Sequence, residues 1–329
     1  MSTTPKAAQI RRASYTEVGP EHAGQRIDNF LLARLKGVPR SHVYRLIRSG
    51  QVRVNSGRVR VSYRVCTGDR VRLPPVARRK DPEAQFPREG LEWLEERILF
   101  EDDRLLVLDK PSGMAVHAGT GIDFGCIEAL RSLRINHPGL DLVHRLDRGT
   151  SGCLLVAKRR SVLKELHALI RAGKIEKRYL ALVSGSWQHG RIKVTDRLAV
   201  VRRHNGESFT RVDPSGKEAV SEFRVVENYG KRATLLEVQI GTGRMHQIRV
   251  HAAHMGHPIA GDERYGDDEF NSALSSRGLR RIFLHAHAVG FTWPEGGDEF
   301  MVDAPLPDEL RQVQRVFETS GSKPRSRRV

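Results

Sequence analysis

A single carboxylate between two cations is the feature of this sequence best suited to chemistry. Asp147 lies between Arg145 and Arg148. Two glycines follow shortly after and predict a loop, and the apolar run at 153–157 predicts a buried strand. Loops anchored on rigid elements often carry catalytic groups, and neighbouring cations favour the ionised form of an acid. Taken alone, the stretch fits a catalytic carboxylate as well as it fits a surface ion pair.

A histidine-rich region further along the chain offers a metal site as an alternative. Its candidate ligands are His246, His251, His254, His257, Asp262, Glu263, His285 and His287. Zinc ligands on one helix favour positions i and i+4, whereas the histidines at 251, 254 and 257 are spaced by three residues. The spacing favours histidines that stack on, or hydrogen bond to, a nucleic acid, and we expect no metal.

Nucleophilic catalysis by serine or cysteine has weaker support. The chain has no Gly-x-Ser-x-Gly elbow. Ser151 has no evident base in the sequence, and Cys153 falls in the predicted buried strand, where a thiol is inert.

Two further side chains, Arg244 and Tyr179, could work together with Asp147. Arg244 follows a glycine turn that opens a predicted helix, a place where free backbone N–H groups attract anions. Its charge could keep Asp147 ionised. Tyr179 offers a ring on which a base can stack. One carboxylate, one arginine and one tyrosine in a basic chain indicate work on a nucleoside.

The composition points to a polyanionic partner. Lys and Arg number 56 against 39 Asp and Glu, which gives a net charge of +17, and the pI is about 10.3. Such an excess is typical of nucleic-acid binding. Three cysteines without metal-ligand spacing, no apolar run long enough to cross a membrane and no signal segment indicate a cytoplasmic protein. We find no apolar pattern that requires a partner, so we expect a monomer.

The first part of the chain predicts a small basic domain. Helices are expected over 26–35 and 41–49, followed by a hairpin of strands at 51–54 and 58–61. The helix at 41–49 and the hairpin leave Arg40, Arg45, Arg48 and Arg53 for the outer surface. The pattern resembles the S4 RNA-binding domain, in which these arginines would contact RNA.

The whole chain divides into five predicted segments. They are a flexible basic arm at 1–20, the S4-like domain at 21–74, a proline-rich linker at 75–92, a larger domain at 93–319 and a disordered basic tail at 320–329. In the larger domain we expect strands near 98–100, 105–108, 177–183, 234–240, 283–289 and 300–302, helices at 161–171, after 243 and at 307–319, and a hairpin or insertion at 190–218.

Several motifs, in order, resemble the pseudouridine synthases that act on ribosomal and transfer RNA. They are KPSG at 110–113, HRLD at 144–147 with TSG at 150–152, KRYLALV at 177–183, GRMHQIRVH at 243–251 and GHPIAGD at 256–262. Stretches at 98–103, 116–121, 124–128 and 267–270 are most similar to the members that modify the large ribosomal subunit.

This resemblance implies an α+β protein in which a small α-helix/β-hairpin S4 domain precedes a catalytic domain with a mixed, mainly antiparallel sheet. It implies isomerisation of uridine to pseudouridine in 23S ribosomal RNA, with the base flipped out and no cofactor or metal. Asp147 would be the catalytic carboxylate, acting either on the sugar or on its C2′ proton. Tyr179 would stack on the base and could accept the C5 proton, and Arg244 would pair with Asp147.

The same resemblance assigns RNA contacts to Arg145, Arg148, His246, Gln247 and Arg249. A non-catalytic S4-type ribosome assembly factor is the alternative. It explains the charge and the first domain, but it leaves the later motifs without a role.

Overall fold

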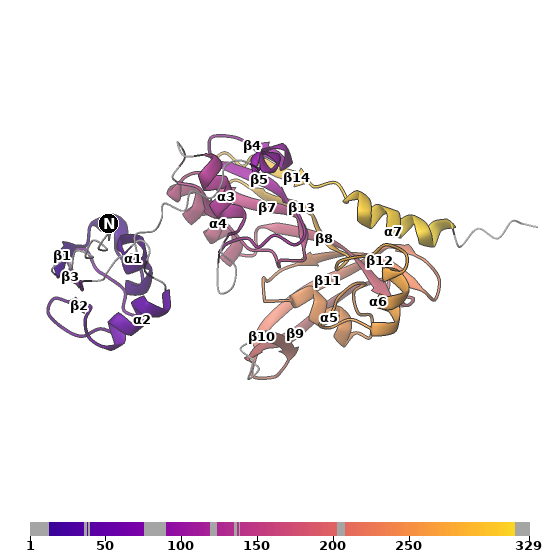
Figure 1. Cartoon of the computed structure of the whole chain (residues 1–329), viewed down its shortest axis with the longest axis horizontal. Helices are drawn as coiled ribbons and strands as arrows, with labels where there is room; N and C mark the ends of the chain where they lie inside the picture. The colour runs from indigo at the N-terminus through magenta and orange to yellow at the C-terminus, as the bar shows by residue number, and fades with distance from the viewer. Residues whose placement is uncertain are drawn as a thin grey trace, which may run out of the picture. The chain divides into compact units, whose positions relative to one another are not determined.

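The computed structural model describes residues 13–35, 38, 40–75, 90–118, 124–134, 137, 139–202 and 208–319 (Figure 1). Two compact units divide the chain at residues 85 and 86, inside the predicted linker, most of which lies outside the described residues. The predicted tail at 320–329 also lies outside them.

The first unit holds two short helices and a small antiparallel sheet. The helices are α1 (Ile27–Arg34) and α2 (Arg40–Arg48), and a 3-10 turn, η1, covers Pro20–His22. The sheet has the order β1 (Ser14–Glu17), β3 (Arg70–Leu73), β2 (Arg53–Val54). Phe30, Leu31, Val43 and Val71 are fully buried in its core.

Two predictions for this unit are wrong. The arm at 1–20 is not flexible throughout, because 14–17 form β1 and pair with 70–73. The strand at 58–61 does not form, since β2 pairs with β3 instead. Both 58–61 and 70–73 alternate in polarity, and alternation alone does not say which segment is the partner.

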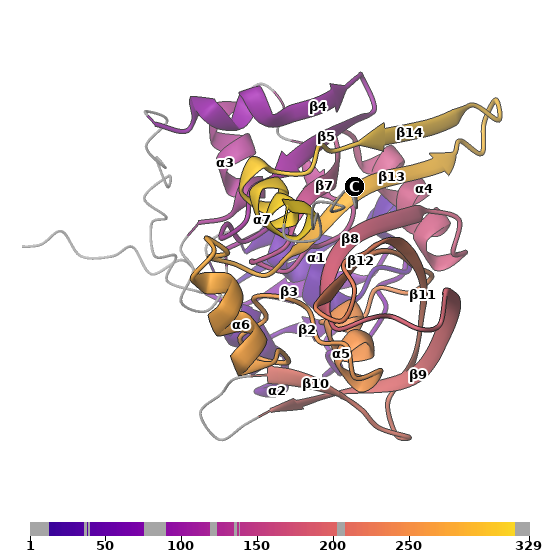
Figure 2. The same cartoon turned by 90° about the vertical axis from the view of Figure 1, so that its right-hand side faces the viewer.

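The second unit is built on one large mixed sheet. Among the described residues it has eleven strands in the order β10-β9-β11-β12-β8-β13-β7-β5-β4, with β14 beside β13 and β6 beside β7. All strand pairs are antiparallel except β13 with β7. The mixed, mainly antiparallel α+β fold is therefore confirmed (Figure 2).

The strands of this sheet follow the predicted segments closely. Their bounds are β4 (Ile98–Glu101), β5 (Leu105–Lys110), β6 (Asp141–Leu142), β7 (Ser151–Ala157), β8 (Glu176–Ser184), β9 (Arg191–Arg202), β10 (Ser208–Val212), β11 (Lys217–Asn228), β12 (Ala233–Ile240), β13 (Leu284–Thr292) and β14 (Glu299–Asp303). The uncertain segment at 190–218 contains a hairpin of β9 and β10 and the start of β11.

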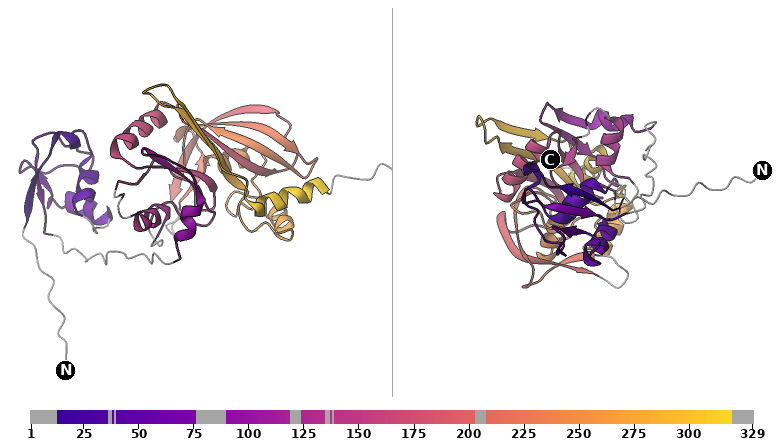
Figure 3. Two further views of the ribbon diagram at one scale, coloured as in Figure 1. Left: turned by 90° about the horizontal axis from the view of Figure 1, so that it is seen from above. Right: turned by 90° about the vertical axis from the view of Figure 1, so that its left-hand side faces the viewer.

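Helices cover both faces of the sheet (Figure 3). On one face lie α3 (Cys126–Leu133) and α5 (Gln247–His254), packed on the alternate residues Tyr179, Ala181, Leu236 and Val238. On the other lie α4 (Arg160–Arg171), α6 (Asp268–Ser275) and α7 (Asp308–Thr319). The 3-10 turn η2 (Glu92–Arg97), before β4, packs with α3 on the first face through Leu94. The face under α3 and α5 carries the candidate site.

Candidate active site

The loop that carries Asp147 is held by a buried lysine. Lys110, at the end of β5, is fully buried, and its ammonium donates to the carbonyl oxygens of Pro111 (2.8 Å), Met114 (2.7 Å) and Arg148 (3.2 Å). Burial lowers the pKa of Lys110 to about 8. The three bonds tie the turn after β5 to the loop before β7, and so they fix the position of Asp147. In the sequence Lys110 stands out only as the first residue of the KPSG motif.

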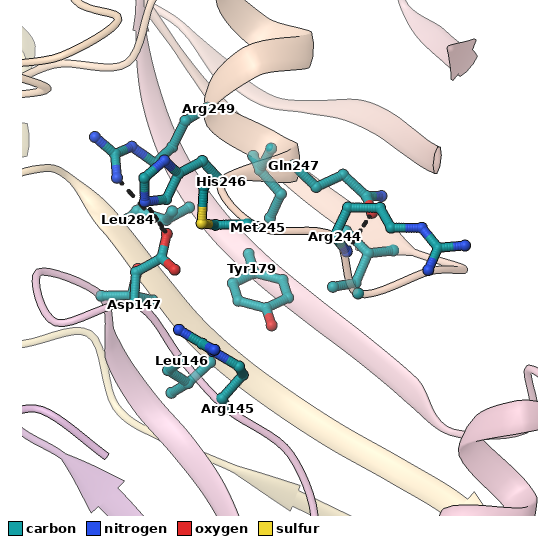
Figure 4. A pocket seen from close by; sticks show the side chains of 14 residues that line it. Arg145, Leu146, Asp147, Tyr179, Arg244, Met245, His246, Gln247, Arg249 and Leu284 are labelled. Carbon is teal, nitrogen blue, oxygen red and sulfur yellow. Dashed lines mark hydrogen bonds and ion pairs between the residues drawn. The ribbon is translucent and has the colours of Figure 1, made fainter. Parts of the chain in front are cut away.

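Two side chains from the start of α5 face Asp147. Nη1 of Arg249 lies 3.7 Å from Oδ2 of the carboxylate, and Nε2 of His246 lies 3.9 Å from the same oxygen (Figure 4). Asp147 is 23% exposed, so it is reachable from solvent but partly shielded. Asp262 holds Arg249 through bonds of 2.7 Å to Nε and to Nη2. The guanidinium of Arg249 is therefore held in place with its Nη1 toward Asp147.

The predicted pairing of Arg244 with Asp147 is wrong. Arg244 is exposed, its Nε donates to the carbonyl of Glu218 (2.9 Å), and its guanidinium points away from Asp147 (Figure 4). The glycine turn leaves Arg244 at the outer edge of the cavity, whereas Arg249, in the first turns of α5, is directed at the Asp147 loop. Arg244 still lines the cavity.

Tyr179 faces the same cavity from β8. It is 6% exposed, and burial, with a smaller contribution from the Asp147 charge, raises the pKa of its hydroxyl. The phenol therefore stays protonated at neutral pH and is a weak proton acceptor. Among the described residues the hydroxyl has no hydrogen-bond partner. Tyr179 therefore offers the cavity an aromatic ring and a protonated hydroxyl.

The cavity opens into a larger basic groove. The cavity has a volume of about 200 Å³ and is lined by Asp147, Tyr179, Arg244 and Arg249 among others. The groove beside it measures about 1330 Å³, and its lining includes Arg145, Arg148, Arg264, Arg280 and Arg281. Arg145 and Arg148 are exposed on its rim, although Arg148 also donates from Nε to the carbonyl of Gly113. A polyanion fits this groove better than a neutral ligand.

The RNA contact predicted for Gln247 is wrong. Gln247 is 3% exposed. Its Oε1 accepts from the Thr242 hydroxyl (2.7 Å) and the Arg244 backbone (3.1 Å). Its Nε2 donates to the Val220 carbonyl (2.8 Å) and the Ser221 hydroxyl (2.9 Å). Every hydrogen-bonding position of the amide is used inside the protein, so Gln247 fastens the glycine turn to β11.

The other histidines are scattered over separate contacts. Nδ1 of His251 lies 3.0 Å from the Ser221 hydroxyl, and Nδ1 of His285 lies 2.9 Å from the Ser151 hydroxyl. The sequence shows no evident base for Ser151, whereas the structure places His285 beside it; both residues are buried, and neither lines the cavity or the groove described above. In the described ranges no group of three or more His, Cys, Asp or Glu could hold a metal ion. Nor does any helix of those ranges have the length and apolarity to span a membrane.

The RNA contacts expected of the S4-domain arginines stay predictions. Arg45 and Arg48 are exposed on α2. Arg53 is exposed as well, and its guanidinium donates to the Gly50 carbonyl at 3.3 Å. Arg40 begins α2, but its side chain lies outside the described residues.

Comparisons with known proteins identify the family of this chain and agree with its fold. The model of the RNA pseudouridylate synthase family matches residues 104–254, and the S4 domain model matches residues 25–71. Ribosomal large subunit pseudouridine synthase C of Yersinia pestis is 49% identical over 296 residues, which cover 89% of this chain and 92% of the relative. The protein of the same name from Haemophilus influenzae is 46% identical over 305 residues, covering 92% of this chain and 94% of the relative.

Solved structures support the fold. The human RNA pseudouridylate synthase domain containing 4 superposes with a TM-score of 0.58 at 23% identity, over 70% of this chain and 96% of that chain. The chain belongs to the RNA pseudouridylate synthase family and is an RNA pseudouridine synthase with an S4 domain. The non-catalytic alternative is therefore wrong, and the resemblance of the sequence motifs to the C type is confirmed.

Proposed function

We propose that this protein isomerises uridine to pseudouridine in 23S ribosomal RNA, with Asp147 as the catalytic carboxylate. The observation that carries the proposal is a half-buried carboxylate facing Arg249 and His246 at the edge of a cavity that Tyr179 lines. The names of the relatives support the large-subunit RNA as substrate. We further propose that it works in the cytoplasm as a monomer.

The reaction balances without a redox partner. The bond from C1′ to N1 of uracil breaks, the base turns, and a bond from C1′ to C5 forms, while the proton on C5 leaves and N1 gains one. No electrons are gained or lost, so we propose that no cofactor or metal takes part. The Asp147 carboxylate starts the reaction, either by adding to the sugar or by taking the C2′ proton of the sugar. Arg249 and His246 both face the carboxylate.

Tyr179 and the groove would hold the substrate. A base inside a helix is out of reach of Asp147, so the uridine has to leave its stack. The ring of Tyr179 then packs against the base, and its protonated hydroxyl argues against the role of proton acceptor at C5. Arginines of the groove, such as Arg145, Arg148 and Arg280, meet the flanking phosphates.

An Asp147→Asn variant tests the catalytic assignment. With 23S RNA carrying uridine tritiated at C5, we expect wild type to release tritium and the variant to release none while it still binds the RNA. Asp103→Asn is the matched control, because Asp103 has the same side chain, 90% exposed, in a turn away from the cavity. Turnover by Asp147→Asn would show that Asp147 is not the catalytic group.

The substrate is tested separately from the chemistry. Pseudouridines should be missing at specific positions of 23S RNA from cells that lack the protein, and they should return when wild type, but not Asp147→Asn, is supplied. An unchanged 23S map together with losses in transfer RNA would refute the proposed substrate and leave the catalytic assignment standing.

A further inference from the structure

Tyr265 lies behind both groups that face Asp147. It belongs to the segment between α5 and α6. Its hydroxyl lies 2.9 Å from Nδ1 of His246. Its ring lies against Arg249, with the guanidinium carbon 5.0 Å from the ring centre. Tyr265 thus contacts His246 at the ring nitrogen that does not face Asp147, and it contacts Arg249 as well.

The direction of the hydrogen bond between Tyr265 and His246 follows from a third group. The backbone N–H of Thr210, on β10, donates to the Tyr265 oxygen at 2.8 Å. The hydroxyl has one proton to give, and Nδ1 of His246 is the acceptor in front of it. A proton on Nδ1 would give the tyrosine oxygen a second donor and turn the lone pair of Nε2 toward the Asp147 carboxylate. The arrangement favours a bare Nδ1 and an N–H on Nε2.

We propose that Tyr265 is a positioning residue that fixes His246 in the tautomer whose Nε2–H points at Asp147. This inference rests on the proposed role of Asp147. Nε2 lies 3.9 Å from the carboxylate oxygen, longer than a hydrogen bond, so its N–H acts by orientation, with the positive end of the dipole toward Asp147. The ring of Tyr265 also packs against the guanidinium of Arg249 and limits where that guanidinium can move.

The charges around His246 agree with a neutral ring. Burial lowers its pKa, Asp147 and Asp262 raise it, and Arg249 and Arg264 lower it, with a net decrease. A neutral imidazole carries its proton on one of two nitrogens, whereas an imidazolium has protons on both. The hydrogen bond from the Tyr265 hydroxyl to Nδ1 of His246 determines which nitrogen carries the proton.

The contact also joins the site to the β9–β10 hairpin. Thr210 pairs with Val200 in that hairpin, and Nη1 of Arg264, next to Tyr265, donates to the Ser208 carbonyl of the same strand. Because the donor to Tyr265 is a backbone group of β10, the position of the hairpin determines where the hydroxyl sits. The backbone of β10 is therefore part of the support of the active site.

A Tyr265→Phe variant removes the hydroxyl and keeps the ring. We expect kcat for tritium release to fall about tenfold with KM within about twofold of wild type, since one hydrogen bond is lost and the RNA contacts remain. Tyr229→Phe is the matched control, because Tyr229 is also buried and its hydroxyl bonds to Glu227 on β11, away from the cavity. The control should change kcat less than about twofold.

Nitrogen NMR of protein labelled in histidine reads the tautomer directly, with the His246 signals assigned as those that His246→Gln lacks. Wild type should show a bare Nδ1 and a protonated Nε2, and Tyr265→Phe should show protonated Nδ1 appearing. A wild-type ring protonated on Nδ1 would overturn the proposal. An unchanged tautomer in Tyr265→Phe, or an altered one with unchanged kcat, would also overturn it. The NMR result does not depend on the substrate, so failure of the proposed function would appear separately, as absent turnover with the expected tautomer.

Discussion

The cation next to Asp147 comes from Arg249, whose guanidinium is committed on its other side to Asp262. Asp262 is 1% exposed, and a buried carboxylate of this kind needs its ion pair. The two bonds between Arg249 and Asp262 set the angle at which the remaining N–H group meets Asp147. The geometry depends on a planar guanidinium, which lysine does not have.

We therefore expect Arg249→Lys to lower kcat for tritium release by about a hundredfold, because the ammonium cannot hold Asp262 and face Asp147 together. Arg244→Lys is the control from the same motif and should raise KM with kcat nearly unchanged, since Arg244 is exposed and points away from Asp147. Steady-state kinetics of both variants measures the difference. A larger loss of kcat in Arg244→Lys would restore the pairing of Arg244 with Asp147.

At the residue scale, the sequence predicts that the GRMHQIRVH motif belongs to the site, but it does not predict which of its arginines faces Asp147. Both Arg244 and Arg249 belong to the same stretch, and only the start of α5 at Gln247 decides which of them is directed at the Asp147 loop. His246 adopts a left-handed backbone, with φ of 54°, and this conformation is not predictable from a histidine. Tyr265 and Lys110 reach the site through contacts made by distant segments, for which a single sequence carries no spacing signal.

At the scale of elements, the Asp147 loop enters β7 where β7 lies closest to β13. The two strands are parallel, with Ser151 opposite His285 and Gly152 opposite Ala286. Gly152 has φ of +106°, and a Cβ there would lie 2.2 Å from the Ala286 carbonyl oxygen. Only glycine lets the chain leave the loop and join the sheet at this point.

Gly152→Ala should lower the free energy of unfolding by at least about 3 kcal/mol, from backbone strain together with the clash. Gly173→Ala is the control, since Gly173 also has a positive φ, of +67°, but has open space around it. It should cost only about 1 kcal/mol, from backbone strain alone. Urea denaturation of the two variants gives both values. Equal costs would mean that the close approach to Ala286 does not constrain position 152.

The elements themselves were largely predictable where polarity has a clear period. The apolar strands β5, β7, β8 and β12 and the helix α4 fall within a few residues of the expected ranges. The strand β11 carries many charged residues, so its period is weak and the sequence does not single it out. The order of strands in the sheet depends on contacts between distant segments, which the pattern of one chain does not encode.

For the whole molecule, buried histidines make the free energy of unfolding depend on pH. His251 and His285 are fully buried, and burial lowers the pKa of each to about 4. Burial likewise lowers the pKa of His144 to about 3. A histidine in the unfolded chain has a pKa of about 6.5. Between these values the unfolded chain binds protons that the folded protein does not bind, so stability is lost as the pH falls from about 6.5 toward about 4.

The free energy of unfolding should therefore fall by up to about 4.1 kcal/mol per pH unit in that window, about 1.4 for each of these three histidines. Urea denaturation at a series of pH values measures the slope. His251→Gln, which keeps a polar side chain without an imidazole, should lower the slope by about 1.4 kcal/mol per pH unit. A wild-type slope near zero between pH of about 6 and about 5 would contradict the assignment.

The pairing of β7 with β13 has a consequence for synthesis. The strand that ends the Asp147 loop emerges from the ribosome long before its neighbour at Leu284–Thr292. Contacts between segments so far apart in sequence form late in folding. We therefore expect a growing chain to carry all five motifs before it can assemble the site, and translation products that stop short of β13 to be inactive. Activity should appear only when synthesis is nearly finished.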